Sequence, residues 1–237
     1  MIEVPPLPEL IRGPDLARLS GARTTTTRLS DRDITMRRGI KVTTLERTVV
    51  DVALDLPVPD ALVTVDAALR RGVDLSQVKD MLRSRGPVRG AKRARQTFDW
   101  TDRQSETPIE SIGRGQLLIH GVPRPRCNVW FQLGTRSYRV DEHWDELGIV
   151  GEADGRVKYQ GELAVGDTLW QEKIRQDWLE NDVGMLVVRW TSYEMRSRPL
   201  QVVRRWERAA ARRQQIPWER PPNLITWQDP LPLLGTL

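Results

Sequence analysis

Residues 139–144 read RVDEHW and residues 147–155 read LGIVGEADG, and this stretch organises the interpretation of the whole chain. Its apolar and β-branched residues indicate two short strands. Glu152 and Asp154 share one face of the second strand, because side chains alternate along a strand, and Asp141 closes the first strand. We therefore expect three carboxylates to meet at one edge of a sheet.

Such a group of carboxylates favours a hard divalent cation. Like charges at close quarters raise one another's pKa, so a cation would stabilise the group. Mg²⁺ takes oxygen ligands, often from only one or two carboxylates, and leaves its other positions to water and substrate phosphates. The sequence thus predicts a Mg²⁺ or Mn²⁺ site at Asp141, Glu152 and Asp154. The alternative is that these acids are solvated turn residues.

The elements around this stretch carry a resemblance to a known family. A helix with a Thr-Pro start precedes the acids, and a second helix and a strand follow them. In this order of elements the chain resembles the PD-(D/E)xK nuclease superfamily, in the branch similar to very-short-patch-repair endonucleases, over about residues 105–200. The resemblance rests on four groups of residues: Ser105–Glu110, Arg139–Asp141, Glu152-x-Asp154-Gly155, and the succession Arg175, Gly184, Val188-Arg189.

The resemblance implies a fold, an activity and a set of ligands. The fold would be α/β, with a restriction-endonuclease-like mixed sheet flanked by helices, and the activity would be metal-dependent hydrolysis of phosphodiester bonds in DNA. Asp141 and Glu152 would hold the metal, and Asp154 or Glu110 would complete its shell directly or through water.

One position departs from the family pattern. The usual lysine, two residues after the strand glutamate, is Asp154 in this chain. Lys158 and Lys173 are nearby lysines that could replace it, and Arg175 matches a recurrent helix position of the family. Two functions therefore stay open: a Mg²⁺-dependent endonuclease, and a non-catalytic DNA-binding or antitoxin-like regulator with a nuclease-like fold.

Length and composition set wider bounds. The 237 residues are 39% apolar and 29% charged, which allows a buried core and favours two domains. The single cysteine, Cys127, excludes an internal disulfide and favours the cytoplasm. An apolar run of about 18 residues and a leader peptide are both absent from the sequence given, so we expect no membrane partner; a protein partner is not indicated.

The positive charge is concentrated in the first part of the chain. Lysine and arginine outnumber acidic residues by 18 to 13 in residues 1–100 and equal them, 19 to 19, in residues 101–237. Six basic residues fall within thirteen positions that contain no acid. Such a run can bind phosphates independently of sequence, although a solvated surface is the alternative. These predicted nucleic-acid-binding residues are Arg83, Arg85, Arg89, Lys92, Arg93 and Arg95.

The chain divides into four predicted segments. Residues 1–29 form an extended arm, and 30–103 form a small helical domain with a short hairpin at 33–43. Residues 104–213 form the endonuclease-like α/β domain, and 214–237 form a Pro/Trp-rich strap over an apolar groove or a disordered tail. Within the second segment, about 30–85 also resembles the helical domain of AbiEi-type antitoxins, through Ile40–Ala53, without the expected winged helix upstream.

Hydrophobic periodicity places the regular elements. Trp170, Ile174 and Trp178 recur every four residues and predict the core face of one helix, with a stacking platform for an unpaired base as the alternative. Helices are expected near 44–56, 59–71, 74–83, 91–98, 107–119, 166–180 and 197–213, and strands near 126–133, 136–141, 147–153 and 185–190.

Overall fold

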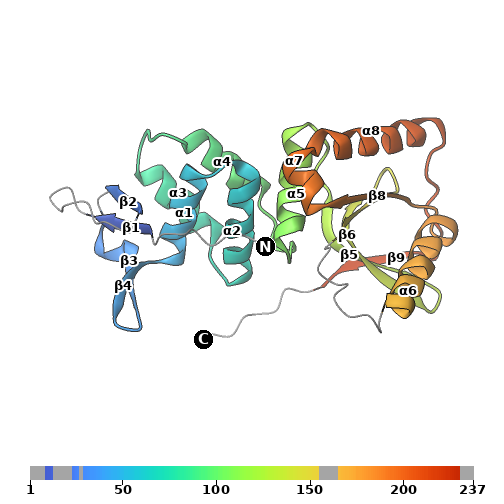
Figure 1. Cartoon of the computed structure of the whole chain (residues 1–237), viewed down its shortest axis with the longest axis horizontal. Coiled ribbons are helices and arrows are strands. Elements are labelled where there is room, and N and C mark those ends of the chain that lie inside the picture. The colour runs from blue at the N-terminus through green and yellow to red at the C-terminus, as the bar shows by residue number, and fades with distance from the viewer. Residues whose placement is uncertain (1–8, 13–22, 27–28, 155–164, 230–237) are drawn as a thin grey trace.

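The computed structural model describes residues 9–12, 23–26, 29–154 and 165–229, and it is a mixed α/β protein (Figure 1). A helical unit, with short strands at its outer end, precedes a unit in which helices surround a five-stranded sheet. In the described part of the chain, every helix is too short or too polar to cross a membrane.

Two pairs of short strands come first. β1 (Glu9–Arg12) and β2 (Arg23–Thr26) are parallel, so the segment for which no regular element was expected contains two. Both strands carry β-branched residues, which fit an extended backbone. β3 (Ile34–Arg37) and β4 (Ile40–Thr43) form the predicted hairpin. Both residues of its turn, Arg38 and Gly39, have positive φ, which is the twist that a two-residue hairpin requires.

Four helices build the first core. α1 (Leu45–Asp55) starts where the Thr44 side chain accepts from the Arg47 amide, and α2 (Val58–Arg70) has proline in its first turn. α3 (Leu75–Ser84) and α4 (Ala91–Trp100) close over them. Their apolar faces meet in one buried cluster: Val49, Val50, Ala53, Val65, Ala68, Leu69, Val73, Val78, Leu82, Ala94 and Phe98.

The five-stranded sheet has the order β8-β7-β6-β5-β9. β5 (Arg126–Leu133), β6 (Arg136–Trp144) and β7 (Ile149–Asp154) form an antiparallel meander, and β8 (Leu186–Thr191) is parallel to β7. β9 (Ile225–Gln228) is antiparallel to β5 at the other edge. The predicted strands are confirmed, and β9 is an additional one.

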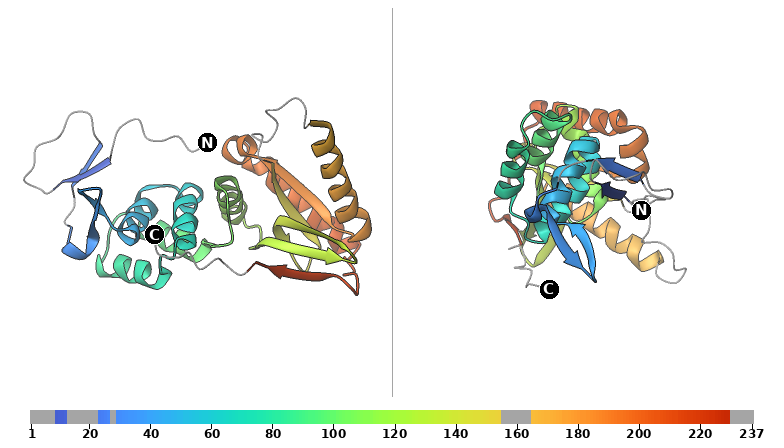
Figure 2. Two further views of the ribbon diagram at one scale, coloured as in Figure 1. Left: turned by 90° about the horizontal axis from the view of Figure 1, so that it is seen from below. Right: turned by 90° about the vertical axis from the view of Figure 1, so that its left-hand side faces the viewer.

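Helices cover both faces of this sheet (Figure 2). On one face α5 (Pro108–Ile119), α7 (Ser192–Ser197) and α8 (Pro199–Gln215) pack over Trp190 and Ile149. On the other, α6 (Val165–Asp177) runs into a π-helical turn (Trp178–Asp182), which packs over Val140 and Val150. The helix expected over 197–213 is present as α8, and α7 is an additional short helix before it, separated from α8 at Arg198.

The predicted core stripe of α6 is wrong at one end. Trp178 is buried, with 2% of its surface exposed, whereas Trp170 is 60% exposed. Four residues turn a helix by 400°, so a four-residue spacing drifts by about 40° at each step. Trp170, two steps from Trp178, has rotated off the buried face.

The segment after α8 lies on the sheet unit, as the strap interpretation expected for the residues up to 229. The Trp218 indole donates to the Val183 carbonyl oxygen at 3.0 Å and packs on the core below α6. A Cβ on Gly148 would lie 2.3 Å from the Trp218 ring, so glycine is required at that contact. The strap thus continues into β9.

Candidate functional site

The site lies where β6 and β7 separate. These strands pair over only three positions, ending with Glu142 opposite Gly151. Asp141 and Glu152 are the residues immediately beyond that last pair. This point, where the two strands separate beyond the Glu142–Gly151 pair, is called the β6–β7 fork below. The Asp141 Oδ2 atom accepts from the Ala153 amide at 2.8 Å, which holds its carboxylate in the fork. Asp141 and Glu152, two of the three carboxylates predicted to share one site, therefore meet at one point of the sheet.

Glu110 reaches the same fork from the first turn of α5. It is 94% buried and accepts from the Thr107 hydroxyl at 2.5 Å and the Glu106 amide at 2.8 Å. Its negative charge is a cause of the raised pKa of Asp141. Glu110 thus caps the helix, as a first-turn acid does, and also contributes charge to the site.

Asn128 supports this arrangement and was missed by the sequence analysis. It lies mid-strand in β5 at a φ of +50°, and it interrupts the pairing with β6, which passes from Cys127–Glu142 to Val129–Val140 and leaves out Asn128 and Asp141. Its buried side-chain amide donates to the Gln104 carbonyl oxygen at 2.6 Å and to Glu110 Oε2 at 2.8 Å. A non-glycine residue at positive φ inside a strand is costly and tends to occur at functional sites.

Burial favours the protonated forms of both Asp141 and Glu152. Burial raises the pKa of Asp141 to about 6, helped by Glu110 and opposed by the Ala153 amide and Arg175. Burial raises the pKa of Glu152 to about 8; Arg175, whose guanidinium donates to its Oε2 atom, lowers it, and Asp141 raises it. The Glu152 Oε1 atom is buried without a hydrogen-bond partner in the described residues. Negative charge is therefore only partly compensated.

Glu142 adds a further acid that the sequence analysis did not single out. It is 99% buried, and neither carboxylate oxygen has a hydrogen-bond partner among the described residues. Burial raises the pKa of Glu142 to about 8, opposed by Arg114 and helped by Asp141 and Glu110. Its position next to Asp141 was the only sequence signal for a role near the site. Neighbouring residues of a strand point to opposite faces of the sheet, so that signal argued against Glu142.

Asp154 lies at the rim rather than inside the fork. Its side chain is 53% exposed, and Arg189 Nη1 is 3.9 Å from its carboxylate. Arg189 also donates to Glu172 at 2.7 Å. The described residues contain no group of three or more His, Cys, Asp or Glu side chains placed to hold a metal ion. Asp154 is thus separate from the pair formed by Asp141 and Glu152.

Two lysines, Lys158 and Lys173, were predicted as possible replacements for the lysine of the PD-(D/E)xK pattern. Lys158 lies outside the described residues, and Lys173 is exposed on α6. Arg175, two residues further along the same helix, is the cation that the structure places on Glu152.

The predicted basic run is divided between structural and exposed residues. Arg85 pairs with Asp51 at 2.8 Å, and Arg93 donates to the backbone carbonyls of Leu54 and Asp55 at the end of α1. Arg83 forms a surface pair with Asp80. Three residues are exposed and have no acidic partner in the described part of the chain: Arg89, Lys92 and Arg95.

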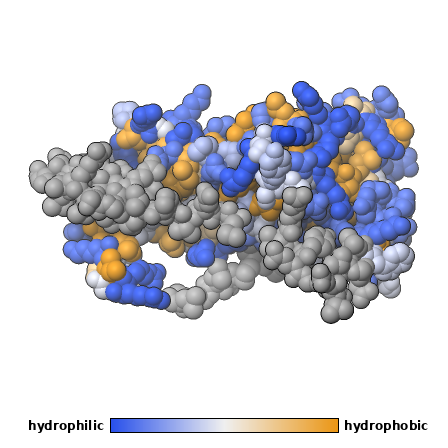
Figure 3. Space-filling model, viewed as in Figure 1, coloured by the Kyte–Doolittle hydropathy of each residue, from blue (hydrophilic) through white to orange (hydrophobic). Residues whose placement is uncertain are grey.

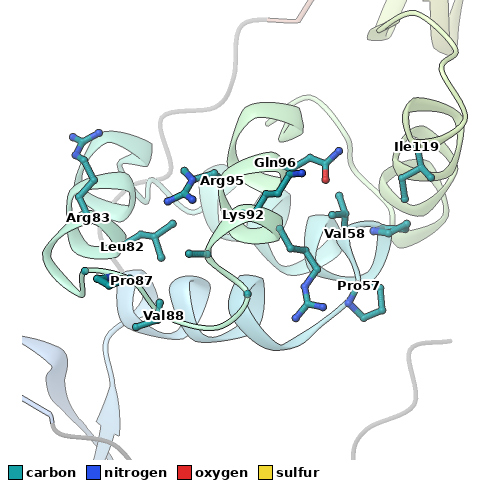
Figure 4. Close-up of a pocket in the computed structure, with 15 residues that line it drawn as sticks. Pro57, Val58, Leu82, Arg83, Pro87, Val88, Lys92, Arg95, Gln96 and Ile119 are labelled. Atoms are coloured by element: carbon teal, nitrogen blue, oxygen red, sulfur yellow. The ribbon is translucent and has the colours of Figure 1, made fainter.

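Beside this run lies a pocket of about 990 Å³. Figure 4 shows Arg83, Leu82, Pro87 and Val88 on one side, and Pro57, Val58 and Ile119 on the other. Lys92, Arg95 and Gln96 lie between them. Ile119 comes from α5, so both units line the pocket, and its basic members belong to the predicted phosphate-binding run.

A fully buried ion pair joins the two units. Arg114 of α5 donates to Asp66 Oδ2 of α2 at 2.6 Å, and both side chains are 0% exposed. The two Asp66 oxygens accept three more hydrogen bonds, from the Thr101 hydroxyl, the Asp102 amide and the Ser111 hydroxyl, at 2.6 to 2.8 Å. Nothing in the sequence indicated this pairing.

Cys127 lies against this pair. Its Sγ atom accepts from Arg114 at 3.6 Å, and burial raises the pKa of its thiol far above the usual value. A thiol held protonated is a poor nucleophile, so Cys127 is a structural residue.

Comparison with known proteins adds relatives without assigned roles. The chain is 29% identical over 135 residues to two proteins of Mycobacterium tuberculosis, one from strain CDC 1551 / Oshkosh and one from strain H37Rv, both described as uncharacterized. The match covers 55% of this chain, which spans about half the length of each relative. No family model matches, and no solved structure matches.

Proposed function

We propose that this chain is a divalent-metal-dependent nuclease that hydrolyses phosphodiester bonds in DNA, on a restriction-endonuclease-like arrangement of the sheet unit. The observation that carries the proposal is the convergence of Asp141 and Glu152 at the β6–β7 fork, with Glu110 behind them and a buried carboxylate oxygen left unpartnered. We also propose a cytoplasmic location, which the single cysteine and the proposed DNA substrate support.

The residues of the fork fit Mg²⁺ or Mn²⁺. Both cations take carboxylate oxygens, and Asp141 and Glu152 would hold one, with the charge of Glu110 nearby. Burial raises the pKa of Asp141 and Glu152, and a neighbouring carboxylate raises each further, so a bound cation would stabilise their charged forms. When bound, the metal would polarise the scissile phosphate and lower the pKa of a coordinated water.

The chain's own residues have distinct tasks in this proposal. Arg175 pairs with Glu152 and would also stabilise charge that develops on the phosphate, which is the task of the lysine in the PD-(D/E)xK pattern. Glu110, fixed by Thr107 and Asn128, keeps the site electronegative. Because ligand carboxylates must lose their protons, metal binding should strengthen as pH rises through the pKa of Asp141, about 6, and then through the pKa of Glu152, about 8.

The affinity for DNA is assigned to exposed basic residues. Arg89, Lys92 and Arg95 can each contact a phosphate without breaking an ion pair described in the structure. Arg93 is unsuitable for testing this, because replacing it would also remove hydrogen bonds to the end of α1.

A second function is favoured by one specific observation. Arg175 already neutralises Glu152, and Asp154 stands in the position of the family lysine, an arrangement that a site without metal could retain. The chain would then be a non-catalytic DNA-binding or antitoxin-like regulator, in which the fork is a relic of a nuclease site.

Cleavage and binding assays separate the two functions. With supercoiled plasmid and Mg²⁺ or Mn²⁺, the nuclease should nick or linearise DNA, and Asp141→Ala or Glu152→Gln should reduce cleavage to background while DNA binding changes little. Glu219→Gln, which removes an exposed acid far along the chain, is the matched control and should cleave normally. DNA binding without cleavage under any divalent metal would support the regulator.

A further inference from the structure

Helix α8 carries an uneven distribution of arginine. Five arginines fall between positions 204 and 213, with Glu207 as the acid among them. Val202, Val203 and Trp206 are buried against the sheet and fix the orientation of the helix. This orientation divides the arginines into two groups.

The first group is anchored to the protein. Arg205 donates to Glu194 at 2.8 Å, and Glu194 in turn caps the start of α7 through Thr191. Arg213 donates to the backbone carbonyls of Gly148 and Gly184, which lie at the starts of β7 and β8. Both are partly buried. These two side chains therefore support the fold.

The second group projects into solvent. Arg204, Arg208 and Arg212 are exposed, and none has an acidic partner in the part of the chain that the structure describes. They recur every four residues, so they form a ridge about 12 Å long on one side of the helix. Burial lowers the pKa of Arg213, and the neighbouring charge of Arg212 lowers it further, which reflects the local excess of positive charge. These three residues are called the α8 ridge below.

The ridge lies apart from the carboxylate site. α8 packs on the face of the sheet that carries Trp190, whereas Arg175 approaches Glu152 from α6 on the opposite face. Figure 1 shows α8 along the upper edge of the sheet unit and α4 along the upper edge of the helical unit. Figure 3 shows mostly hydrophilic residues over the region of α8. The ridge is thus a separate surface with its own charge.

We propose that the α8 ridge is a second binding surface for the phosphate backbone of DNA. It rests on the proposed function only in the identity of its ligand, a nucleic acid. Three unpaired arginines in a row present forked donors suited to phosphate oxygens, and their binding is independent of sequence. The exposed residues of the basic run supply the first surface, and the α8 ridge supplies the second.

The test measures binding of the full chain to a fluorescent 20-base-pair duplex of arbitrary sequence, without divalent metal, across a series of salt concentrations. The variant Arg204→Gln/Arg208→Gln/Arg212→Gln should bind roughly tenfold more weakly at moderate salt, with a salt dependence shallower by about 2.7 in logarithmic slope, since each lost phosphate contact reduces the slope by about 0.9. Its unfolding temperature should be unchanged, because the three side chains touch solvent.

The matched control removes the same charge elsewhere. Arg32, Arg37 and Arg38 are exposed on or beside the β3–β4 hairpin, so replacing all three by Gln changes the net charge equally. Glu207→Gln should strengthen binding, because it removes the acid beside the ridge. If the hairpin variant weakened duplex binding as much as the α8 variant does, the loss would follow from net charge alone, and the proposal would be overturned.

Other ligands and the cleavage assay give separate outcomes. Binding of phosphatidylserine vesicles or polyglutamate through the ridge, with duplex binding unaffected by its removal, would assign the surface to a membrane or an acidic protein and overturn the proposal. Loss of duplex binding in a chain that never cleaves DNA would uphold the ridge and reject the nuclease. If the chain cleaves DNA and its duplex binding is unchanged in the ridge variant, the nuclease is supported and the ridge proposal is rejected.

Discussion

Two buried carboxylates of this protein each meet an arginine, and their surroundings differ. Asp66 and Arg114 lie between the two units, where the oxygens of Asp66 accept four hydrogen bonds. Glu152 pairs with Arg175 at the fork, but one of its oxygens has no partner in the described structure and Asp141 lies close by. A satisfied pair serves the fold, whereas a pair with excess negative charge is suited to a ligand.

The largest expected effect breaks the satisfied pair. Arg114→Ala leaves Asp66 buried without its cation, and loss of one partner of a buried pair costs about 3–5 kcal/mol. We expect the free energy of unfolding, measured in urea, to fall by that amount. A change below about 1 kcal/mol would show that water or another group replaces the guanidinium.

The next prediction uses the pH dependence of the unsatisfied region. Burial raises the pKa of Glu142 from 4.5 to about 8, so its protonated form is favoured in the folded state. Its contribution to stability is complete below pH 4.5 and is lost as the pH rises through 8. Glu142→Gln keeps the shape without the charge, and should be more stable than the wild type at pH 8.

Unfolding temperatures measured between pH 5 and pH 9 check this prediction. The wild type should lose stability over that interval more steeply than Glu142→Gln does. Parallel curves would mean that Glu142 keeps a normal pKa through partners other than those described.

A smaller effect sharpens the contrast through metal binding. Addition of Mn²⁺ at pH 8 should raise the unfolding temperature of the wild type, because a ligand that binds only the folded state stabilises it. Asp141→Ala should lose this response, and Arg114→Ala should retain it at a lower baseline. If Mn²⁺ raised the unfolding temperature of Asp141→Ala as much as that of the wild type, the metal would bind somewhere other than the fork.

The smallest effect comes from an exposed pair. Lys79 Nζ lies 2.9 Å from Asp99, with side chains 37% and 63% exposed. Such pairs contribute about 0–1 kcal/mol, so Lys79→Ala should scarcely change unfolding in urea. If Lys79→Ala lowered the free energy of unfolding as much as Arg114→Ala does, burial could not explain why the two ion pairs differ in their contribution to stability.

Local signals predicted much of the fold. The cap at Thr44, the prolines that begin helices and the alternation through residues 149–154 each act within a few residues, and the elements they predicted are present. The predicted burial of Trp170 was wrong, because a four-residue spacing does not match the helical repeat and so turns this side chain away from the buried face of α6. The strands β1, β2 and β9 were missed, because a strand of four residues depends on pairing with another strand, which its own sequence does not reveal.

The candidate site was predicted in part. Asp141 and Glu152 were singled out because acids beside apolar residues are conspicuous in sequence, although β6 continues past Asp141 to Trp144 instead of ending there. Asn128 and Glu142 were missed, since a positive φ and an unpaired buried carboxylate arise only from tertiary packing. The same limit applies to Arg85 and Arg93, whose charges suggested DNA but whose hydrogen bonds hold the helical unit.

Strand β9 gives the order of synthesis a structural consequence. It pairs with β5 along Val129–Gln132, nearly a hundred residues earlier in the chain. While a ribosome is still making residues 225–228, β5 therefore presents an open row of amides and carbonyls, which other extended chains can join. The nascent protein is therefore exposed to misassembly until β9 emerges and pairs with β5.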